Sequence, residues 1–158
     1  SLGQGLSVAN GMAIASKIDK INNRVYCLLG DGELEEGQVW EACMTASKYK
    51  LDNLCAIVDC NNLQLTGDIE SVKGLDCENI ENKFKSFGFN TVVINGNSIV
   101  EILEAFKKAK SVKEKPTCII AKTIKGKGVS FMENNVSWHG KAPSEEEYKN
   151  AIEEINKN

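Results

Sequence analysis

Four short apolar runs set the strongest limit on the fold of this chain. They lie at 24–29, 54–58, 91–94 and 117–121, and each is largely continuous rather than alternating between apolar and polar residues. Runs of this kind are typical of strands buried on both faces of a parallel sheet. Amphipathic segments alternate with them, which predicts an α/β fold: a doubly wound, mainly parallel sheet with helices on both faces. The expected helices are 6–18, 38–49, 80–87, 98–110 and 144–155.

Two helix starts have the pattern of a capping box, in which a serine and a glutamate three residues later each accept a backbone N–H. These pairs are Ser98 with Glu101 and Ser144 with Glu147. The regions 61–79 and 123–143 are long and poorly periodic, which predicts loops. Long loops in a compact domain are usually functional or disordered.

The composition is that of an ordinary globular domain. The length of 158 residues fits one domain, 1–158, with 42% hydrophobic and 26% charged residues. The net charge of −3 argues against a nucleic-acid-binding protein, which would carry a basic excess. No apolar run approaches the roughly 18 residues of a membrane-spanning helix, and no segment has the pattern of a signal peptide. We therefore expect a cytoplasmic protein without a membrane partner.

Cysteine usage favours reduced thiols. The six cysteines form no CxxC pair, and only one histidine is present to complete a zinc set. Most lie in apolar or helical segments, where a thiol packs as a small core residue. We therefore favour reduced thiols over disulfides or a metal site. The cysteines are Cys27, Cys43, Cys55, Cys60, Cys77 and Cys118.

Polar residues follow the first two apolar runs at the point where each ends. Gly30-Asp31-Gly32 follows the first run, and Asn61-Asn62 follows the second. Ligands of open parallel sheets bind beyond the carboxyl ends of the strands, so the site is expected there. A carboxylate, a carboxamide oxygen and a backbone carbonyl are ligands that Mg²⁺ or Ca²⁺ prefers. Phosphate oxygens usually complete the coordination shell of Mg²⁺ in proteins. Glycines and the following helix start favour a bound phosphate, so the pattern indicates a diphosphate with a divalent ion.

Other motifs fit less well. Glu35 stands where a dinucleotide-binding G-x-G-x-x-G needs glycine, and the Gly-Lys-Ser/Thr of a P-loop is absent from the sequence. An EF-hand would need a preceding helix and a glycine at position 36, where the chain has Glu36. A tight strand-to-helix turn also explains Gly30-Asp31-Gly32 taken alone.

The spacing of the two halves favours a cofactor site. In this sequence 28 residues, 33–60, separate Gly-Asp-Gly from Asn-Asn. The chain here resembles the thiamine diphosphate enzymes, whose signature is these two halves with a spacer of somewhat under thirty residues. Four stretches in order, SLGQGLSVANGMA, GDGELEEGQVWEA, DCNNLQLTG and SWHGKAP, resemble transketolase. They match in particular the N-terminal half that forms a separate chain in split transketolases, and the resemblance covers Ser1 to about Pro143.

The resemblance implies thiamine diphosphate and Mg²⁺ (or Ca²⁺) as cofactors and sugar phosphates as substrates. Transketolases of the pentose phosphate pathway transfer a two-carbon ketol unit from a ketose phosphate to an aldose phosphate. By this resemblance Asp31 and Asn61 give side-chain oxygens to the metal, and Leu63 gives its carbonyl oxygen. Gly30 and Gly32 let the backbone approach the diphosphate, and Gly32 donates its N–H.

The remaining family positions lie farther apart in the chain. Leu2 matches a backbone position near the aminopyrimidine, and Ile124 matches a residue packed near the thiazolium. His139 matches a catalytic histidine that touches the diphosphate and the substrate's hydroxyl end. A loop histidine without a role is the alternative. Glu36 and Glu41 match acids at a dimer interface that couples two active sites, although acids also suit a helix start.

The resemblance also implies that parts of the family's enzyme are missing from this chain. The chain begins without methionine, so we expect a fragment that lacks upstream residues, including family histidines. The family's activating glutamate lies on a pyrimidine-binding domain, for which this sequence has no second α/β unit. We therefore expect an inactive isolated chain that needs a C-terminal transketolase chain in a homo- or hetero-oligomer. Deoxyxylulose-phosphate synthase, a 2-oxoacid dehydrogenase component and a non-catalytic remnant are the alternatives.

Overall fold

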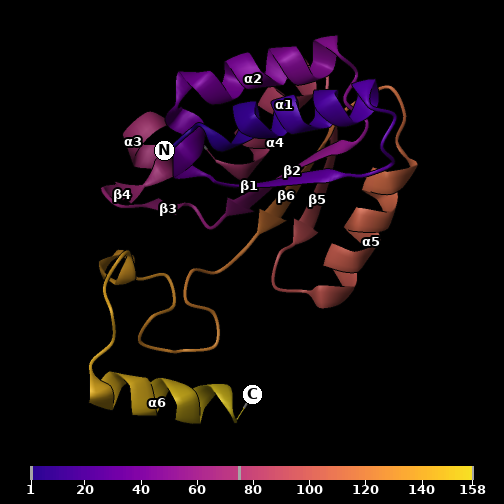
Figure 1. Ribbon diagram of the computed structural model, residues 1–158. Helices are drawn as coiled ribbons and strands as arrows, with labels where there is room; N and C mark the ends of the chain where they lie inside the picture. Colours follow the sequence, from indigo (N-terminus) through magenta and orange to yellow (C-terminus); the bar gives the residue numbers. More distant parts are fainter. Residues whose placement is uncertain (1, 75, 158) are drawn as a thin grey trace.

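A parallel sheet forms the centre of the computed structural model, which describes residues 2–74 and 76–157 (Figure 1). The strand order is β1 (Val25–Gly30), β2 (Leu54–Cys60), β6 (Thr117–Lys122) and β5 (Asn90–Asn95). Every neighbouring pair is parallel, and the register places Gly30 opposite Asp59 and Cys60 opposite Lys122. All four strands therefore end at the same edge of the sheet. The predicted strands are confirmed within one or two residues.

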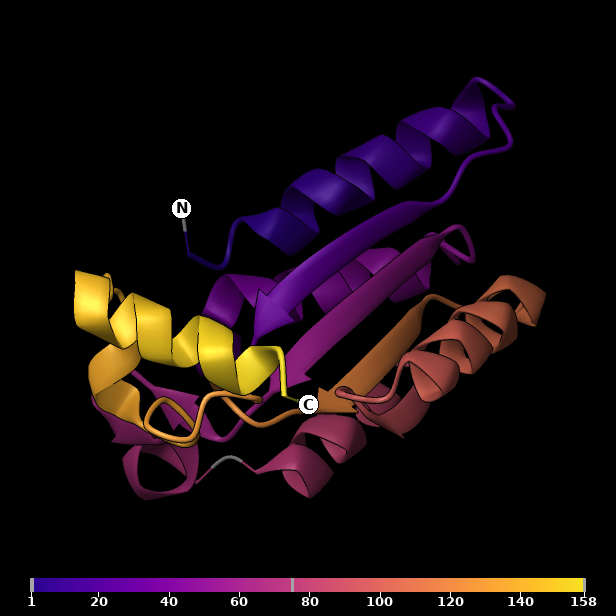
Figure 2. The ribbon, with the colours of Figure 1, turned by 90° about the horizontal axis from the view of Figure 1, so that it is seen from below.

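Helices cover both faces of the sheet, as the doubly wound prediction requires. On one face α1 (Gly5–Ile18), α2 (Gly37–Lys48) and α4 (Cys77–Ser86) share a core with β1, β2 and β6. On the other face α5 (Ile99–Ser111) packs over β5 and β6 through a separate apolar cluster. In Figure 2 this second face is seen with α5 in front, while β1 and β2 are left open to view. Leu28 on β1 is accordingly 70% exposed.

An aromatic cluster packs α4 against α2. The Phe84 ring is fully buried, with its centroid 5.3 Å from those of both Trp40 and Phe89. The Trp40 indole N–H donates to the carbonyl of Leu34, which ties α2 to the turn that precedes it. These contacts hold the start of α2 close to the tip of β1.

The region 61–79, which the sequence predicted as a loop, contains short elements. A two-stranded hairpin, β3 (Leu63–Gln64) with β4 (Gly67–Asp68), is followed by α3 (Ile69–Lys73). Ile69 is fully buried, and its N–H donates to the carbonyl of Asn62. Tertiary burial of one side chain therefore stabilises a segment that lacks periodicity of its own. Leu75, Ser1 and Asn158 lie outside the described residues.

The second long region, 123–143, is mostly irregular and ends in a capped helix. It contains a single 3-10 turn, η2 (Val136–Trp138), and leads to α6 (Glu145–Ile155). Figure 1 shows α6 set apart from the sheet at the far end of this loop. The capping box of Ser144 and Glu147 is confirmed, with both hydrogen bonds formed.

The other predicted capping box is only half formed. The Ser98 hydroxyl accepts the N–H of Glu101, but the Glu101 carboxylate accepts the N–H of Asn95 instead of that of Ser98. The Ser98 N–H donates to the carbonyl of Asn95, so this donor is already satisfied by a turn. The turn at the end of β5 therefore replaces the second half of the box.

The prediction of six reduced thiols is wrong for two of them. Cys60, the last residue of β2, and Cys77, the first of α4, form a disulfide with a Cα–Cα separation of 6.2 Å. Packing of α4 beside the tip of β2 brings together residues that no short-range pattern connects. The other four cysteines are free and buried, and burial raises the pKa of the Cys43 and Cys55 thiols to about 12. No helix among residues 2–74 and 76–157 has the length and apolarity to cross a membrane.

Candidate functional site

The Asp31 carboxylate joins the tips of β1 and β2. Asp31 is only 1% exposed and caps the 3-10 helix η1 (Gly32–Glu35), where its Oδ1 accepts the Gly32 N–H at 2.8 Å. Its other oxygen, Oδ2, accepts the Asn62 N–H at 2.6 Å. Charge-assisted bonds of this kind are short and strong. One side chain therefore fixes the turn after β1 against the turn after β2.

Burial disfavours the ionised form of the Asp31 carboxyl. Desolvation raises the pKa of the Asp31 carboxyl above its ordinary value, and the charge of Asp59 adds to the rise. N–H donation from Asn62 and Gly32 opposes the rise without cancelling it. A positive charge beside the carboxylate would favour its ionised form.

The loop after β2 folds back on itself and offers oxygen atoms. The Asn61 Oδ1 accepts the Leu63 N–H at 3.0 Å, and Asn62 has a left-handed φ of 61°. Among the described residues, no group of three or more His, Cys, Asp or Glu side chains is arranged to hold a metal. A metal at this edge would therefore need amide and backbone oxygens beside Asp31. That hard-oxygen set suits Mg²⁺ or Ca²⁺.

The two glycines of the turn differ in what surrounds them. A Cβ at Gly32 would lie 2.9 Å from the Gln64 Cβ, so close packing against β3 excludes any side chain there. A Cβ at Gly30 would meet no protein atom within 4 Å, and its φ is not positive. The fold itself therefore does not require glycine at position 30, where open space adjoins the backbone.

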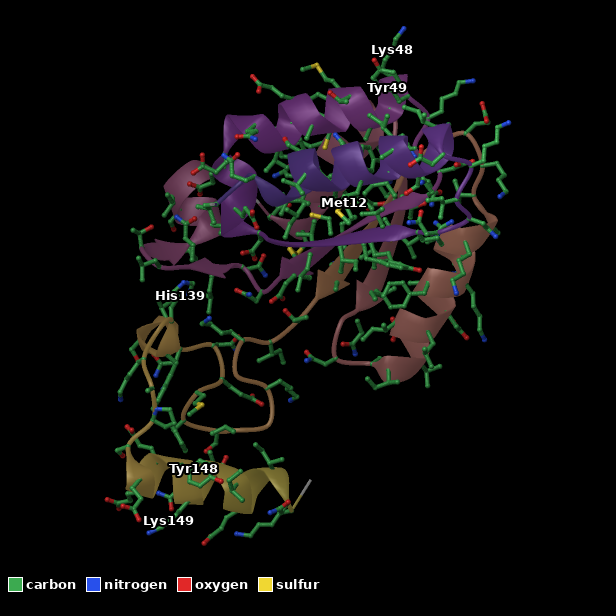
Figure 3. All side chains as sticks on the ribbon, viewed as in Figure 1. Met12, Lys48, Tyr49, His139, Tyr148 and Lys149 are labelled. Atoms are coloured by element: carbon green, nitrogen blue, oxygen red, sulfur yellow. A yellow bond between two sulfur atoms is a disulfide. The ribbon has the colours of Figure 1, made fainter. Side chains whose placement is uncertain are left out.

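A cavity of about 630 Å³ lies at this edge of the sheet. It gathers backbone and side chains from both turns, from the N-terminal segment and from the loop after β6. Figure 3 shows His139 on that loop, reaching toward the β3–β4 hairpin. Eight of the residues predicted for the site line it: Leu2, Gly30, Asp31, Gly32, Glu36, Asn61, Leu63 and His139.

Two predicted residues lie elsewhere. Ile124 lines a different hollow at the tips of β5 and β6, and its N–H donates to the Asn97 Oδ1 at 3.0 Å. Glu41 is exposed on α2 and lines a hollow between α1 and α2, away from the cavity. The cavity thus brings together most of the predicted cofactor residues, while Glu41 lies on the exposed face of α2.

The structure adds residues that sequence reasoning did not assign. Glu33, Gln64 and Lys125 also line the cavity. Glu33 lies three residues after Gly30, close enough to contact the end of β1. This spacing could have predicted that Glu33 belongs to the site. Gln64 and Lys125 carry no such signal, because the hairpin and the loop that place them depend on tertiary contacts.

Comparison with known proteins identifies relatives of the whole chain. Residues 1–156 match the family model described as "Transketolase, thiamine diphosphate binding domain". The chain is 43% identical to one of the subunits of the apulose-4-phosphate transketolase of Phocaeicola vulgatus, covering 98% of this chain and 54% of that protein. It is 46% identical to human transketolase, covering 98% of this chain and 24% of the relative.

The fold has a close counterpart among solved structures. A transketolase crystal structure from Campylobacter jejuni superposes with a TM-score of 0.89 at 39% identity. The match covers 98% of this chain and 25% of that one. The chain therefore spans about half the length of the Phocaeicola relative and about a quarter of the whole transketolases.

We expect Gly30→Ala and Gly32→Ala to differ in their effect on folding. Gly30→Ala should change the free energy of unfolding by less than about 1 kcal/mol, because its methyl group enters open space. Gly32→Ala should lower it by about 1–3 kcal/mol, because the new Cβ overlaps Gln64. Urea unfolding of the two variants measures the difference. Equal destabilisation by both would contradict the space assigned to Gly30.

Proposed function

This chain belongs to the thiamine diphosphate-binding domain family of transketolases, and we propose that, with a partner chain, it transfers a two-carbon ketol unit between sugar phosphates. The donor is a ketose phosphate and the acceptor an aldose phosphate. The observation that carries the proposal is the cavity where Asp31, Asn61 and Gly30 meet at two neighbouring strand tips. When bound, the thiamine cofactor supplies a nucleophilic carbon and an electron sink.

The residues of the cavity fit a metal-bound diphosphate. Asp31 and Asn61 would hold Mg²⁺ through side-chain oxygens, and Leu63 through its carbonyl oxygen. The open space at Gly30 leaves room for phosphate oxygens, and the Gly32 N–H lies at the start of η1, where backbone donors favour anions. Rigid strand tips are suited to holding a reactive group in one orientation.

Other residues would contact the parts of the cofactor and substrate beyond the diphosphate. Leu2, 63% exposed at the cavity, would meet the aminopyrimidine. Ile124 lines the neighbouring hollow at the tips of β5 and β6, and a role beside the thiazolium rests on the family resemblance alone. His139 would donate a hydrogen bond to phosphate or substrate and move a proton there. Its exposed position on the loop after β6 leaves it accessible to an incoming substrate.

The catalytic unit is proposed to be larger than this chain. The chain covers only 54% of a relative that is itself one part of a multi-chain enzyme by its name, so a second chain would carry the pyrimidine-binding domain. Glu36, beside the cavity, and Glu41, on the exposed face of α2, would lie at the interface that couples two sites. A cytoplasmic location stays a prediction from the sequence.

We expect the cofactor to bind through the metal. Titration of the protein with thiamine diphosphate should quench or shift the tryptophan fluorescence in the presence of Mg²⁺ and not after chelation. Asp31→Ala should weaken this binding by about 100-fold or more, because a metal ligand is lost. Gly30→Ala should also bind weakly although it folds, because its methyl group fills the space kept for phosphate.

The control for this titration is Asp19→Asn, which removes a carboxylate at the far end of α1 and should bind like the original chain. Metal-independent binding of normal affinity by Asp31→Ala would contradict the assignment of the metal site.

Activity should appear only with a partner. The chain alone is expected not to convert xylulose 5-phosphate and ribose 5-phosphate, because no described residue supplies the activating glutamate of a pyrimidine-binding domain. Adding the C-terminal transketolase chain should restore turnover in a coupled assay. Turnover by the chain alone would contradict the partner requirement. Release of carbon dioxide from pyruvate by the reconstituted pair would favour one of the alternative thiamine enzymes.

A further inference from the structure

Glu33 makes two hydrogen bonds that join separate segments beside the cavity. Its Oε1 accepts the N–H of Gly3 at 2.8 Å, and its Oε2 accepts the N–H of Gly30 at 3.2 Å. Gly3 belongs to the segment before α1, whereas Gly30 is the last residue of β1. A single half-buried carboxylate therefore connects the N-terminal segment to the strand tip that adjoins Asp31.

The N-terminal segment has further contacts that fix its path. Gly3 has a φ of +77°, and a Cβ there would lie 2.8 Å from the Glu36 Cβ, so the backbone is pressed against the start of α2. The Gln4 and Gln38 side chains donate to each other, at 2.6 and 3.1 Å. The segment 2–4, which we call the strap, thus lies across the turn after β1. Leu2 at its end lines the cavity.

The position of Glu33 is unfavourable by charge alone. It lies in a cavity already lined by Asp31, Asp59, Glu35 and Glu36, and that cavity is proposed to bind a diphosphate. An added negative charge opposes an anionic ligand. The Glu33 carboxylate accepts two backbone N–H groups, and these charge-assisted hydrogen bonds stabilise the fold enough to offset this repulsion.

We propose that Glu33 is a positioning residue that holds the strap against the tip of β1. The position of Leu2 relative to Gly30 is thereby fixed, and Leu2 lies where it can contact the cofactor. This inference rests on the proposed function, because it assigns the strap to the part of the ligand beyond the diphosphate. Glu33 touches no reacting atom and acts through the backbone of Gly3 and Gly30. Loss of its two bonds should free the strap while the metal-bound diphosphate site stays intact.

Three variants of the full chain separate this role from a general effect of charge. Glu33→Ala removes both acceptors, and Glu33→Gln leaves one acceptor oxygen for the two donors. Glu35→Gln is the matched control, because it removes one negative charge from the same 3-10 helix and leaves both Glu33 bonds in place. Circular dichroism tests whether each variant is folded.

The first measurement is hydrogen exchange of the strap in the cofactor-free protein. Glu33→Ala should raise the exchange rate of the Gly3 amide by about tenfold or more, with a smaller rise in Glu33→Gln and none in Glu35→Gln. An unchanged rate in Glu33→Ala would overturn the proposal, because the strap would then be held without Glu33.

The second measurement compares two ligands in the presence of Mg²⁺: thiamine diphosphate, and inorganic pyrophosphate, which lacks the aminopyrimidine that Leu2 is proposed to meet. Glu33→Ala should weaken binding of thiamine diphosphate by about tenfold and leave binding of pyrophosphate unchanged or tighter. Equal weakening for both ligands would indicate general damage to the site and overturn the positioning role.

The same comparison keeps the two hypotheses distinct. If the unmodified chain binds neither ligand even when its C-terminal partner chain is present, the proposed function fails. If it binds thiamine diphosphate and Glu33→Ala binds it equally well, only the role of Glu33 fails.

Discussion

The hydrogen bond from the Asn62 N–H to the buried Asp31 carboxylate is the contact on which the rest of the site depends. It spans the two turns that leave β1 and β2, at a distance of 2.6 Å. The parallel register places Gly30 beside Asp59, so both turns leave the sheet at the same height. Asp31 then fixes their relative position, which determines where Asn61, Leu63 and the glycine backbone lie.

The charge balance of the cavity explains why a cation is needed in the proposed function. Five carboxylates line it, whereas one lysine and one histidine represent the basic side chains. A diphosphate alone would be repelled by such a lining. A divalent ion held by Asp31 and the oxygens of the Asn61 loop would offset the negative charge of the nearest carboxylate and attract the diphosphate. Affinity for the anion would then come from the metal and from backbone N–H groups rather than from basic side chains.

The sheet and its flanking helices were predictable because each strand is a continuous apolar run and each helix has a regular apolar face. The proximity of Asp31 and Asn61 was predictable for a related reason: the ends of neighbouring parallel strands meet at one edge. The β3–β4 hairpin and α3 were not predictable, because burial of Ile69 stabilises them rather than local periodicity. Tertiary proximity likewise decides two other contacts. These are the disulfide between Cys60 and Cys77 and the hydrogen bond from the Asn95 N–H to the Glu101 carboxylate.

A crystal structure of the chain with thiamine diphosphate and Mn²⁺ would show whether Asp31 and Asn61 hold the metal, because Mn²⁺ substitutes for Mg²⁺ and scatters anomalously. We expect one strong anomalous peak for an ion held by the Asp31 carboxylate, the Asn61 amide oxygen and the Leu63 carbonyl oxygen, beside the bound diphosphate. A bound diphosphate whose Mn²⁺ lies away from Asp31 and Asn61 would contradict this expectation.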